Sequence, residues 1–256
     1  LFITSRLINA EAHAGMARAA RQDAIALVRA SSRDATADGE AGDSGAVRLA
    51  VWTYRATGGE NALLGDLRQS LASVTGDPTT AGAAVALARA EEALGDPDAA
   101  FATLHGFFAA HPAHLDLLKE LIARTRTSGQ YKSVLDDAAE ALRTDPSRND
   151  ALLKIFNPAM QTQAAATWSA DSKAHAVASD PWRDYLRALT DDAEEADPAV
   201  IDAEYHAAVA GAPRFFPARQ AYIAWLVAGE RFTQANELAR QAIDTNTGGP
   251  QAWVVW

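Results

Sequence analysis

Histidines are the first candidates for chemistry in this 256-residue chain, because they serve as metal ligands and as acid–base groups near neutral pH. Three of the six lie close together, at His105, His111 and His114. A zinc site needs three or four ligands that converge from well-spaced positions. His111 and His114 flank Pro112 in an expected turn, and His105 lies almost two helical turns earlier. We therefore expect no metal site at these histidines.

An acidic run, TDDAEEADP, occupies residues 190–198 and could supply paired catalytic carboxylates. Nothing in the sequence places the run in a cleft, so we interpret it as a solvated turn whose carboxylates cap helix ends. The chain has no phosphate-binding glycine loop, no dinucleotide fingerprint, no GxSxG nucleophile motif and no HExxH zinc motif. These observations predict a non-catalytic protein that requires no cofactor.

The composition predicts an all-α protein. Hydrophobic residues make up 48% of the chain, and alanine, which favours helices and lets them approach closely, is the commonest of them. The net charge of −10 disfavours nucleic acid as a partner. No apolar run approaches the roughly 20 residues that a membrane span needs, so we expect no membrane insertion. The absence of cysteine excludes disulfides, but the compartment of this expected soluble protein, cytoplasm or periplasm, stays open.

Prolines recur at an interval of thirty-four residues, at Pro78, Pro112 and Pro146. Pro213 follows Pro146 after two such intervals less one residue. Each proline ends a helix, and a glycine or an Asp-Pro pair marks a turn inside the unit, so each unit contains two helices. Residues 35–46 are polar and glycine-rich, and we interpret them as an inserted loop. The register predicts repeats at 1–34, 47–80, 81–114, 115–148, 149–181, 182–215 and 216–249, with a partial unit at 250–256.

This pattern resembles the tetratricopeptide repeat family, in which large residues, a turn glycine, alanines and a final proline occupy fixed positions. The resemblance covers nearly the whole chain. Asp66 departs from it by standing where a small residue belongs, and Pro158 is expected to interrupt the first helix of the degenerate unit. In the unit at 216–249 the turn glycine, Gly229, comes one residue early. The matching residues are Leu87, Gly95, Ala100, Leu104 and Pro112; Leu118, Leu121, Gly129, Tyr131, Ala138, Ala141 and Pro146; and Tyr222, Phe232, Ala235 and Ala239.

The resemblance implies an α-solenoid of antiparallel helix pairs, wound into a right-handed superhelix of seven pairs and a partial eighth. It also implies a protein–protein interaction scaffold that binds a peptide or a protein surface along the concave groove lined by the first helices. An alternative is an accessory or assembly arm of a larger enzyme or cell-envelope complex. We expect a fragment of a longer chain, whose apolar end at residues 253–256 promotes self-association.

In that family, six positions of each first helix face the groove, and here they carry a basic surplus of about four. We expect an acidic or carboxylate-ended segment in the groove, held by Arg48, Arg55 and Arg89, with Trp52 as a stacking anchor. The alternative is that surface positions hold these charges by chance. The family's carboxylate clamp is matched only at Asn9, so recognition of a chaperone C-terminus is not expected. The basic groove residues are Arg6, Arg48, Arg55, Arg89, Lys119, Arg126, Lys154, Arg183 and Arg187, and the acidic ones are Glu92, Asp116, Glu120, Asp150 and Glu194.

Overall fold

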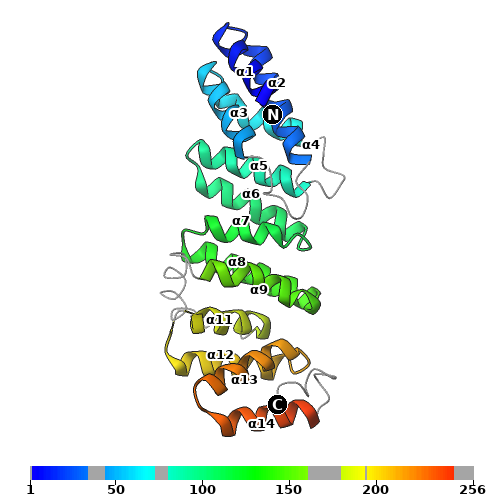
Figure 1. Ribbon diagram of the computed structural model, residues 1–256, viewed down its shortest axis with the longest axis vertical. Helices are drawn as coiled ribbons and strands as arrows, with labels where there is room; N and C mark the ends of the chain where they lie inside the picture. Colours follow the sequence, from blue (N-terminus) through cyan, green and yellow to red (C-terminus); the bar gives the residue numbers. More distant parts are fainter. Residues whose placement is uncertain (1, 34–43, 73–79, 161–179, 194, 245–256) are drawn as a thin grey trace. The chain divides into compact units, whose positions relative to one another are not determined.

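The computed structural model describes residues 2–33, 44–72, 80–160, 180–193 and 195–244 (Figure 1). Every regular element within these ranges is a helix, so the prediction of an all-α protein is confirmed. Residue contacts divide the chain into two compact units, Leu1–Arg124 and Thr125–Trp256, called unit 1 and unit 2 below. The division falls between the two helices of the repeat expected at 115–148.

Unit 1 is a series of helices in which each helix packs against the next and against helices further along the chain. First helices of successive expected repeats contact one another, since α1 packs on α3, α3 on α5 and α5 on α7. Contacts between α1 and α2, and between α5 and α6, join the two helices within a repeat. The elements are α1 (Phe2–His13), α2 (Ala17–Arg33), α3 (Ser44–Ala56), the 3-10 turn η1 (Glu60–Ala62), α4 (Leu63–Ala72), α5 (Thr80–Ala93), α6 (Pro97–Ala110) and α7 (Asp116–Arg124).

The core of unit 1 follows from apolar residues at helical spacing. In α4, Leu63, Leu67 and Leu71 recur every four residues and are all buried, because that spacing places them on one face of the helix. In α2, Ala24 and Val28 occupy the facing positions. The small alanines allow close approach of the helices, while the larger side chains fill the space between them.

Unit 2 contains a second series of packed helices with an aromatic core. α8 packs on α11, α11 on α12, α12 on α13, and α13 on α14. The rings of Tyr205 and Tyr222 stack at 5.4 Å, and Tyr185 meets Phe215 edge-on at 5.2 Å, so aromatic pairs join α11, α12 and α13. The elements are α8 (Ser128–Thr144), the 3-10 turn η2 (Pro146–Arg148), α9 (Asn149–Met160), α11 (Pro181–Ala193), α12 (Pro198–Gly211), α13 (Phe216–Ala228) and α14 (Phe232–Asp244).

Asp-Pro pairs begin three of the described α-helices, α6, α11 and α12. The Ala99 amide donates to Asp96 Oδ1 at 2.9 Å at the start of α6, and the Ala199 amide donates to Asp197 Oδ1 at 2.9 Å at the start of α12. A proline follows each aspartate at the first helical position, where its missing N–H costs no intrahelical bond. The same dipeptide therefore caps a helix in each unit.

The turns between helices depart from the expected glycine pattern in unit 2. Gly95 joins α5 to α6 with a φ of 93°, which glycine adopts without strain. Between α13 and α14 the left-handed residue is Glu230, with a φ of 57°, and Gly229 keeps a negative φ. Gly129 is not a turn residue, because α8 already begins at Ser128. A capping box of Thr127 and Gln130 starts that helix instead.

Two expected boundaries differ from the structure. The loop predicted at 35–46 is too long, because its last three residues, 44–46, already belong to α3 and Ala46 is buried in the core. Pro158 does not end α9, which continues to Met160. A proline in the last turn removes a single backbone hydrogen bond, and the helix tolerates that loss near its end. The second half of the unit at 149–181 and the partial unit at 250–256 lie outside the described residues.

Candidate partner-binding surface

Three exposed side chains of α3 form a stripe along one face of that helix. Arg48, Trp52 and Arg55 are spaced four and three residues apart, so they project from the same side. Val51 and Tyr54 project away from this face and are buried. The Trp52 side chain is 40% exposed, although its large ring favours burial. This α3 stripe therefore presents an aromatic ring between two guanidinium groups.

Helix α1 packs beside α3 and adds polar groups to the α3 stripe. The imidazole of His13 lies 5.8 Å from the Trp52 ring. Its Nδ1 lies 2.7 Å from the main-chain carbonyl of Asn9 and must carry the proton, since a carbonyl oxygen can only accept. Asn9 and Arg6 are exposed on the same side of α1 at helical spacing. The count of charged groove residues in the sequence left out His13, although His13 occupies one of the positions that face the groove in the family.

Arg55 is held at the end of the α3 stripe by two contacts. Its Nε donates to Glu60 Oε1 at 2.7 Å, and one Nη donates to the carbonyl of Ala93 at the end of α5 at 3.0 Å. Both Arg55 and Glu60 are about half exposed, so solvent screens this ion pair and its contribution to stability is small. The contacts fix the direction of the guanidinium and offset part of its charge.

Arg89 belongs to a network of ion pairs that joins α5 to α7. Its Nη2 lies 3.2 Å from Glu120 Oε1, and Glu120 also contacts Arg124 at 2.5 Å. Arg124 in turn lies 3.2 Å from Glu92 Oε2. Two of the acids expected on the groove, Glu92 and Glu120, are thus partners of arginines. Arg89 is only 18% exposed and offers less free charge than its sequence position indicated.

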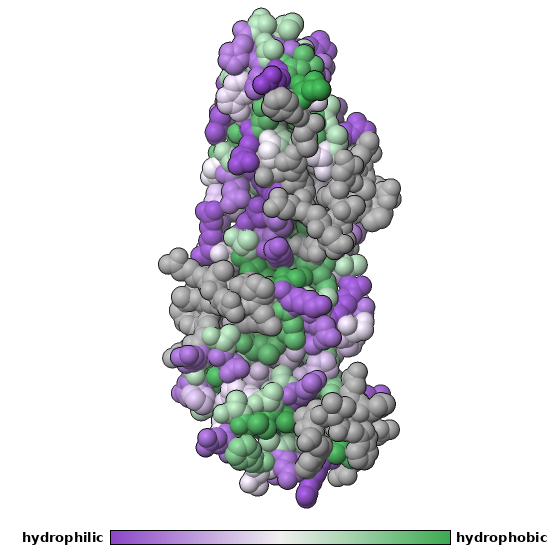
Figure 2. Space-filling view, in the orientation of Figure 1, coloured by the Kyte–Doolittle hydropathy of each residue, from purple (hydrophilic) through white to green (hydrophobic). Residues whose placement is uncertain are grey.

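Two other predicted groove cations of unit 1 are more exposed to solvent. Arg48 and Lys119 are exposed, and neither forms an ion pair with the described residues of the chain. Figure 2 shows hydrophilic side chains gathered along the left edge of unit 1 in that view. Arg48, Arg55 and Arg89 thus lie on two packed helices, α3 and α5, and of the three only Arg48 is both exposed and without an ion pair to the described residues.

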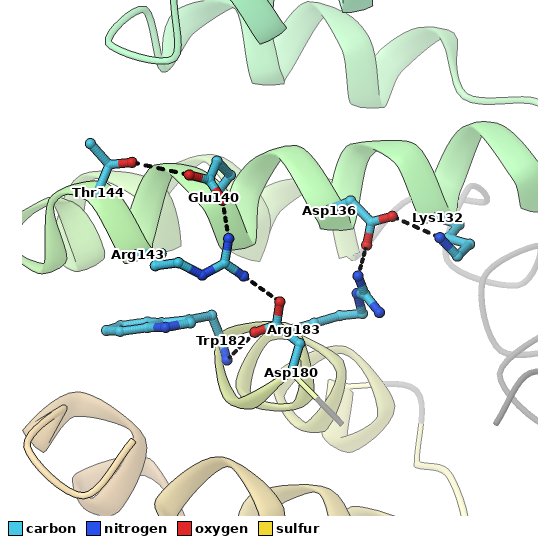
Figure 3. A network of polar contacts seen from close by, with 8 residues as sticks. All are labelled: Lys132, Asp136, Glu140, Arg143, Thr144, Asp180, Trp182 and Arg183. Carbon is cyan, nitrogen blue, oxygen red and sulfur yellow. Dashed lines mark hydrogen bonds and ion pairs between the residues drawn. The ribbon is translucent and has the colours of Figure 1, made fainter. Parts of the chain in front are cut away.

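In unit 2, two of the predicted groove cations are exposed, and two form ion pairs with acids on other helices. Arg126 and Lys154 are exposed, and the Arg126 amide donates to Gln130 Oε1 at 2.8 Å. Arg183 Nη2 lies 2.5 Å from Asp136 Oδ1. Figure 3 shows this contact within a network between α8 and the start of α11, in which Asp136 also meets Lys132. The other members of that network, drawn in the same figure, are Glu140, Arg143, Thr144, Asp180 and Trp182.

The basic surplus counted from the sequence is therefore smaller in the structure. Arg55, Arg183 and Arg187 pair with acids that do not stand at groove positions, and sequence position alone could not assign these partners. Those acids are Glu60, Asp136 and Glu204.

The most perturbed carboxyl groups lie at the interface of α11 and α12. Glu204 is 8% exposed and Asp191 is 4% exposed, and the two carboxyl groups lie close enough for each to shift the pKa of the other. Burial, together with the charge of Asp191, raises the pKa of Glu204 to about 8. Burial also raises the pKa of Asp191, while the Arg187 charge lowers it. Near neutral pH Glu204 therefore keeps its proton, and Arg187 Nη2 lies 3.1 Å from its Oε1.

The acidic run at 190–198 is thus not the uniformly solvated turn predicted from the sequence. Asp191 is buried, and burial raises the pKa of Asp192, which accepts a hydrogen bond from Trp225. Asp197 does cap α12, as expected for an aspartate before Pro198. Asp191 faces the core because α12 packs against α11, whereas Asp192 stays exposed.

The three neighbouring histidines contact aromatic rings. The His105 ring stacks on Phe101 at 5.9 Å, and His111 lies 4.6 Å from the Phe107 ring. His111 and His114 have their ring centres 6.3 Å apart. Among the described residues, no group of three or more histidine or acidic side chains could hold a metal ion.

Comparison with known proteins adds no family to these observations. No protein-family model matches the sequence, and no curated protein matches it significantly. The resemblance to tetratricopeptide repeats is carried by the repeat pattern. None of the helices in the described ranges combines the length and apolar character needed to cross a bilayer.

Proposed function

We propose that the chain is an α-solenoid of antiparallel helix pairs, similar to tetratricopeptide repeats and wound into a right-handed superhelix. The thirty-four-residue spacing of Pro78, Pro112 and Pro146 supports this architecture. The contacts of α1 with α3, α3 with α5 and α5 with α7 support it as well, because first helices of neighbouring repeats line one side of a solenoid.

The function we propose is non-catalytic binding of an acidic peptide segment. The observation that carries it is Trp52, which is 40% exposed between Arg48 and Arg55 on α3. Tryptophan and arginine dominate the binding energy of protein interfaces, because they offer large contact areas together with directed hydrogen bonds. A guanidinium group binds a carboxylate through two parallel hydrogen bonds, and an aromatic ring beside it packs against an apolar neighbour.

The geometry favours a peptide that carries a carboxylate next to an apolar or aromatic side chain. Arg48 forms no ion pair with the described residues and can bind the carboxylate, while the Arg55 guanidinium beside it is held by Glu60. The rings of Trp52 and His13 provide a flat surface for the apolar or aromatic side chain of the peptide. Arg6, Asn9, Arg89 and Lys119 extend the proposed surface within unit 1. Arg126, Lys154 and Arg187 of unit 2 stay predicted contacts.

An array of peptides with varied charge and aromatic content, incubated with the full chain, tests this proposal. We expect the bound peptides to combine Asp or Glu with an apolar residue, and their binding to weaken with added salt, because exposed charges are screened within about 8 Å at physiological ionic strength. Arg48→Glu and Trp52→Ala should each reduce binding about tenfold or more. Arg240→Glu on α14 is the matched control for charge. Peptide selection without acidic preference, or equal binding by Arg48→Glu, would overturn the proposal.

A further inference from the structure

Asp66 departs from the repeat pattern, and the structure shows what it does. It lies on α4, where the family has a small residue, and its Oδ2 accepts a hydrogen bond from the hydroxyl of Tyr54 at 2.6 Å. Tyr54 is 1% exposed, and burial together with this hydrogen bond raises its pKa well above the usual range. The hydroxyl therefore stays protonated at ordinary pH and can keep donating its hydrogen bond to Asp66.

A cleft of about 520 Å³ opens beside this pair, between α2, α3 and α4. The volume lies within the range of small-molecule sites in proteins. Four lining residues, Arg18, Arg21, Gln22 and Ile25, follow one another at helical spacing on α2 and so form a single stripe facing the cleft. Tyr54 and Asp66 form the opposite wall.

Arg21 is fixed in position before any ligand arrives. Its Nε donates to Thr57 Oγ1 at 2.8 Å, and Nη2 donates to the Thr57 carbonyl. Its guanidinium lies 5.4 Å from the centre of the Tyr54 ring. Gly59 packs directly beneath it, so that a Cβ at this position would overlap the guanidinium. A charged group held in this way loses little rotational freedom when it binds an anion.

Arg18 is the second cation of the cleft, one helical turn before Arg21. It is exposed, and it forms no ion pair with the residues that the structure describes. Gln22 adds amide donors on the same face of α2. Asp66 is the one acid among the described residues that line the cleft, and it keeps its negative charge while it accepts the hydrogen bond from Tyr54. Two arginines against one carboxylate leave the cleft with a positive balance.

We propose that this cleft binds a small oxyanion, a carboxylate or a phosphate, between Arg18 and Arg21. Guanidinium groups bind both ions through paired, charge-assisted hydrogen bonds. The site is separate from the α3 stripe, because Tyr54 is buried on one side of α3 whereas Trp52 is exposed on another. It does not depend on the proposed peptide binding.

Nuclear magnetic resonance of the full ¹⁵N-labelled chain tests the site, with inorganic phosphate and succinate as probes at constant ionic strength. We expect either probe to shift the side-chain Nε–H signals of Arg18 and Arg21 and the amides of α2. Binding of one probe alone identifies which oxyanion the cleft prefers. Small ligands of this kind are expected to bind with roughly millimolar affinity. The proposal is overturned if neither probe shifts these signals at millimolar concentration and about 20-fold excess over the protein.

Three variants separate this site from general attraction of anions. Arg18→Gln should weaken binding about tenfold, because it removes a charge-assisted hydrogen bond. Gly59→Ala should weaken it without a change in net charge, because the new Cβ displaces Arg21. Arg240→Gln, which removes an equal charge on the exposed face of α14, should leave binding unchanged. Equal weakening by Arg18→Gln and Arg240→Gln would overturn the proposal, even if Gly59→Ala failed to fold.

Discussion

Replacing Glu204 by glutamine should remove a pH dependence that the buried acid pair imposes on unit 2. Glutamine has the shape of a protonated glutamate and can still donate a hydrogen bond to Asp191. In the native chain Glu204 keeps its proton near neutral pH and releases it as the pH passes about 8. The new negative charge is buried, is repelled by Asp191 and Asp184, and is attracted by Arg187.

The size of the effect follows from the difference between the folded and unfolded pKa of Glu204. The pKa rises from 4.5 in the unfolded chain to about 8 in the fold. The native state therefore holds a proton that the unfolded state has released, and the free energy of unfolding falls as the pH rises through this interval. Between pH 5.5 and 8.5 the loss amounts to about 3 kcal/mol, at about 1.4 kcal/mol for each pH unit up to the folded pKa.

Urea unfolding of the full chain at several values between pH 5.5 and 8.5, followed by circular dichroism, measures this slope. We expect the free energy of unfolding of unit 2 to fall in the native chain and to stay nearly level in Glu204→Gln. Glu237→Gln, on the exposed face of α14, is the matched control and should keep the native slope. A native chain with equal stability at both ends of the range would refute the reasoning, as would a Glu204→Gln variant that keeps the slope.

Two further predictions concern the turns between helices. Gly95→Ala should destabilise unit 1 by about 1 kcal/mol in urea unfolding, because a φ of 93° strains any residue that has a side chain. Gly129→Ala is its control and should be neutral or stabilising, because Gly129 lies inside α8 with open space for a Cβ. Glu230→Gly should raise the thermal midpoint of unit 2, because glycine relieves the left-handed strain at a φ of 57°, and an unchanged or lower midpoint would contradict this.

Local signals predicted the helices well, because the chemistry that begins and ends a helix lies within a few residues. Asp96 and Asp197, each followed by proline, mark helix starts in the sequence and cap helices in the structure. The start of α8 was misplaced although its signal was present. The repeat pattern took Gly129 as a turn glycine, whereas Thr127 and Gln130 on either side of it form a capping box that starts the helix.

The exposure of these candidate side chains was predictable, but their charge partners were not. The groove positions that the family resemblance implies include Arg48, Trp52 and Arg55, and all three are exposed on α3. Their partners come from other elements, as the contact of Arg55 with the carbonyl of Ala93 illustrates. Which acid approaches which arginine depends on side-chain directions in the packed helices, and a repeat register does not contain that information.

Buried acids also explain how such an alanine-rich chain can select one packing of its helices. Glu91 of α5 is 1% exposed, and it is satisfied by Arg68 of α4 at 2.9 Å and by the Thr103 hydroxyl of α6 at 2.7 Å. Glu204 of α12 pairs with Arg187 of α11 at 3.1 Å. Alanine faces resemble one another and tolerate many pairings, but a carboxylate buried away from its partners costs several kcal/mol. An alternative pairing of α5 or α12 would separate these acids from their partners, and that loss disfavours the wrong register.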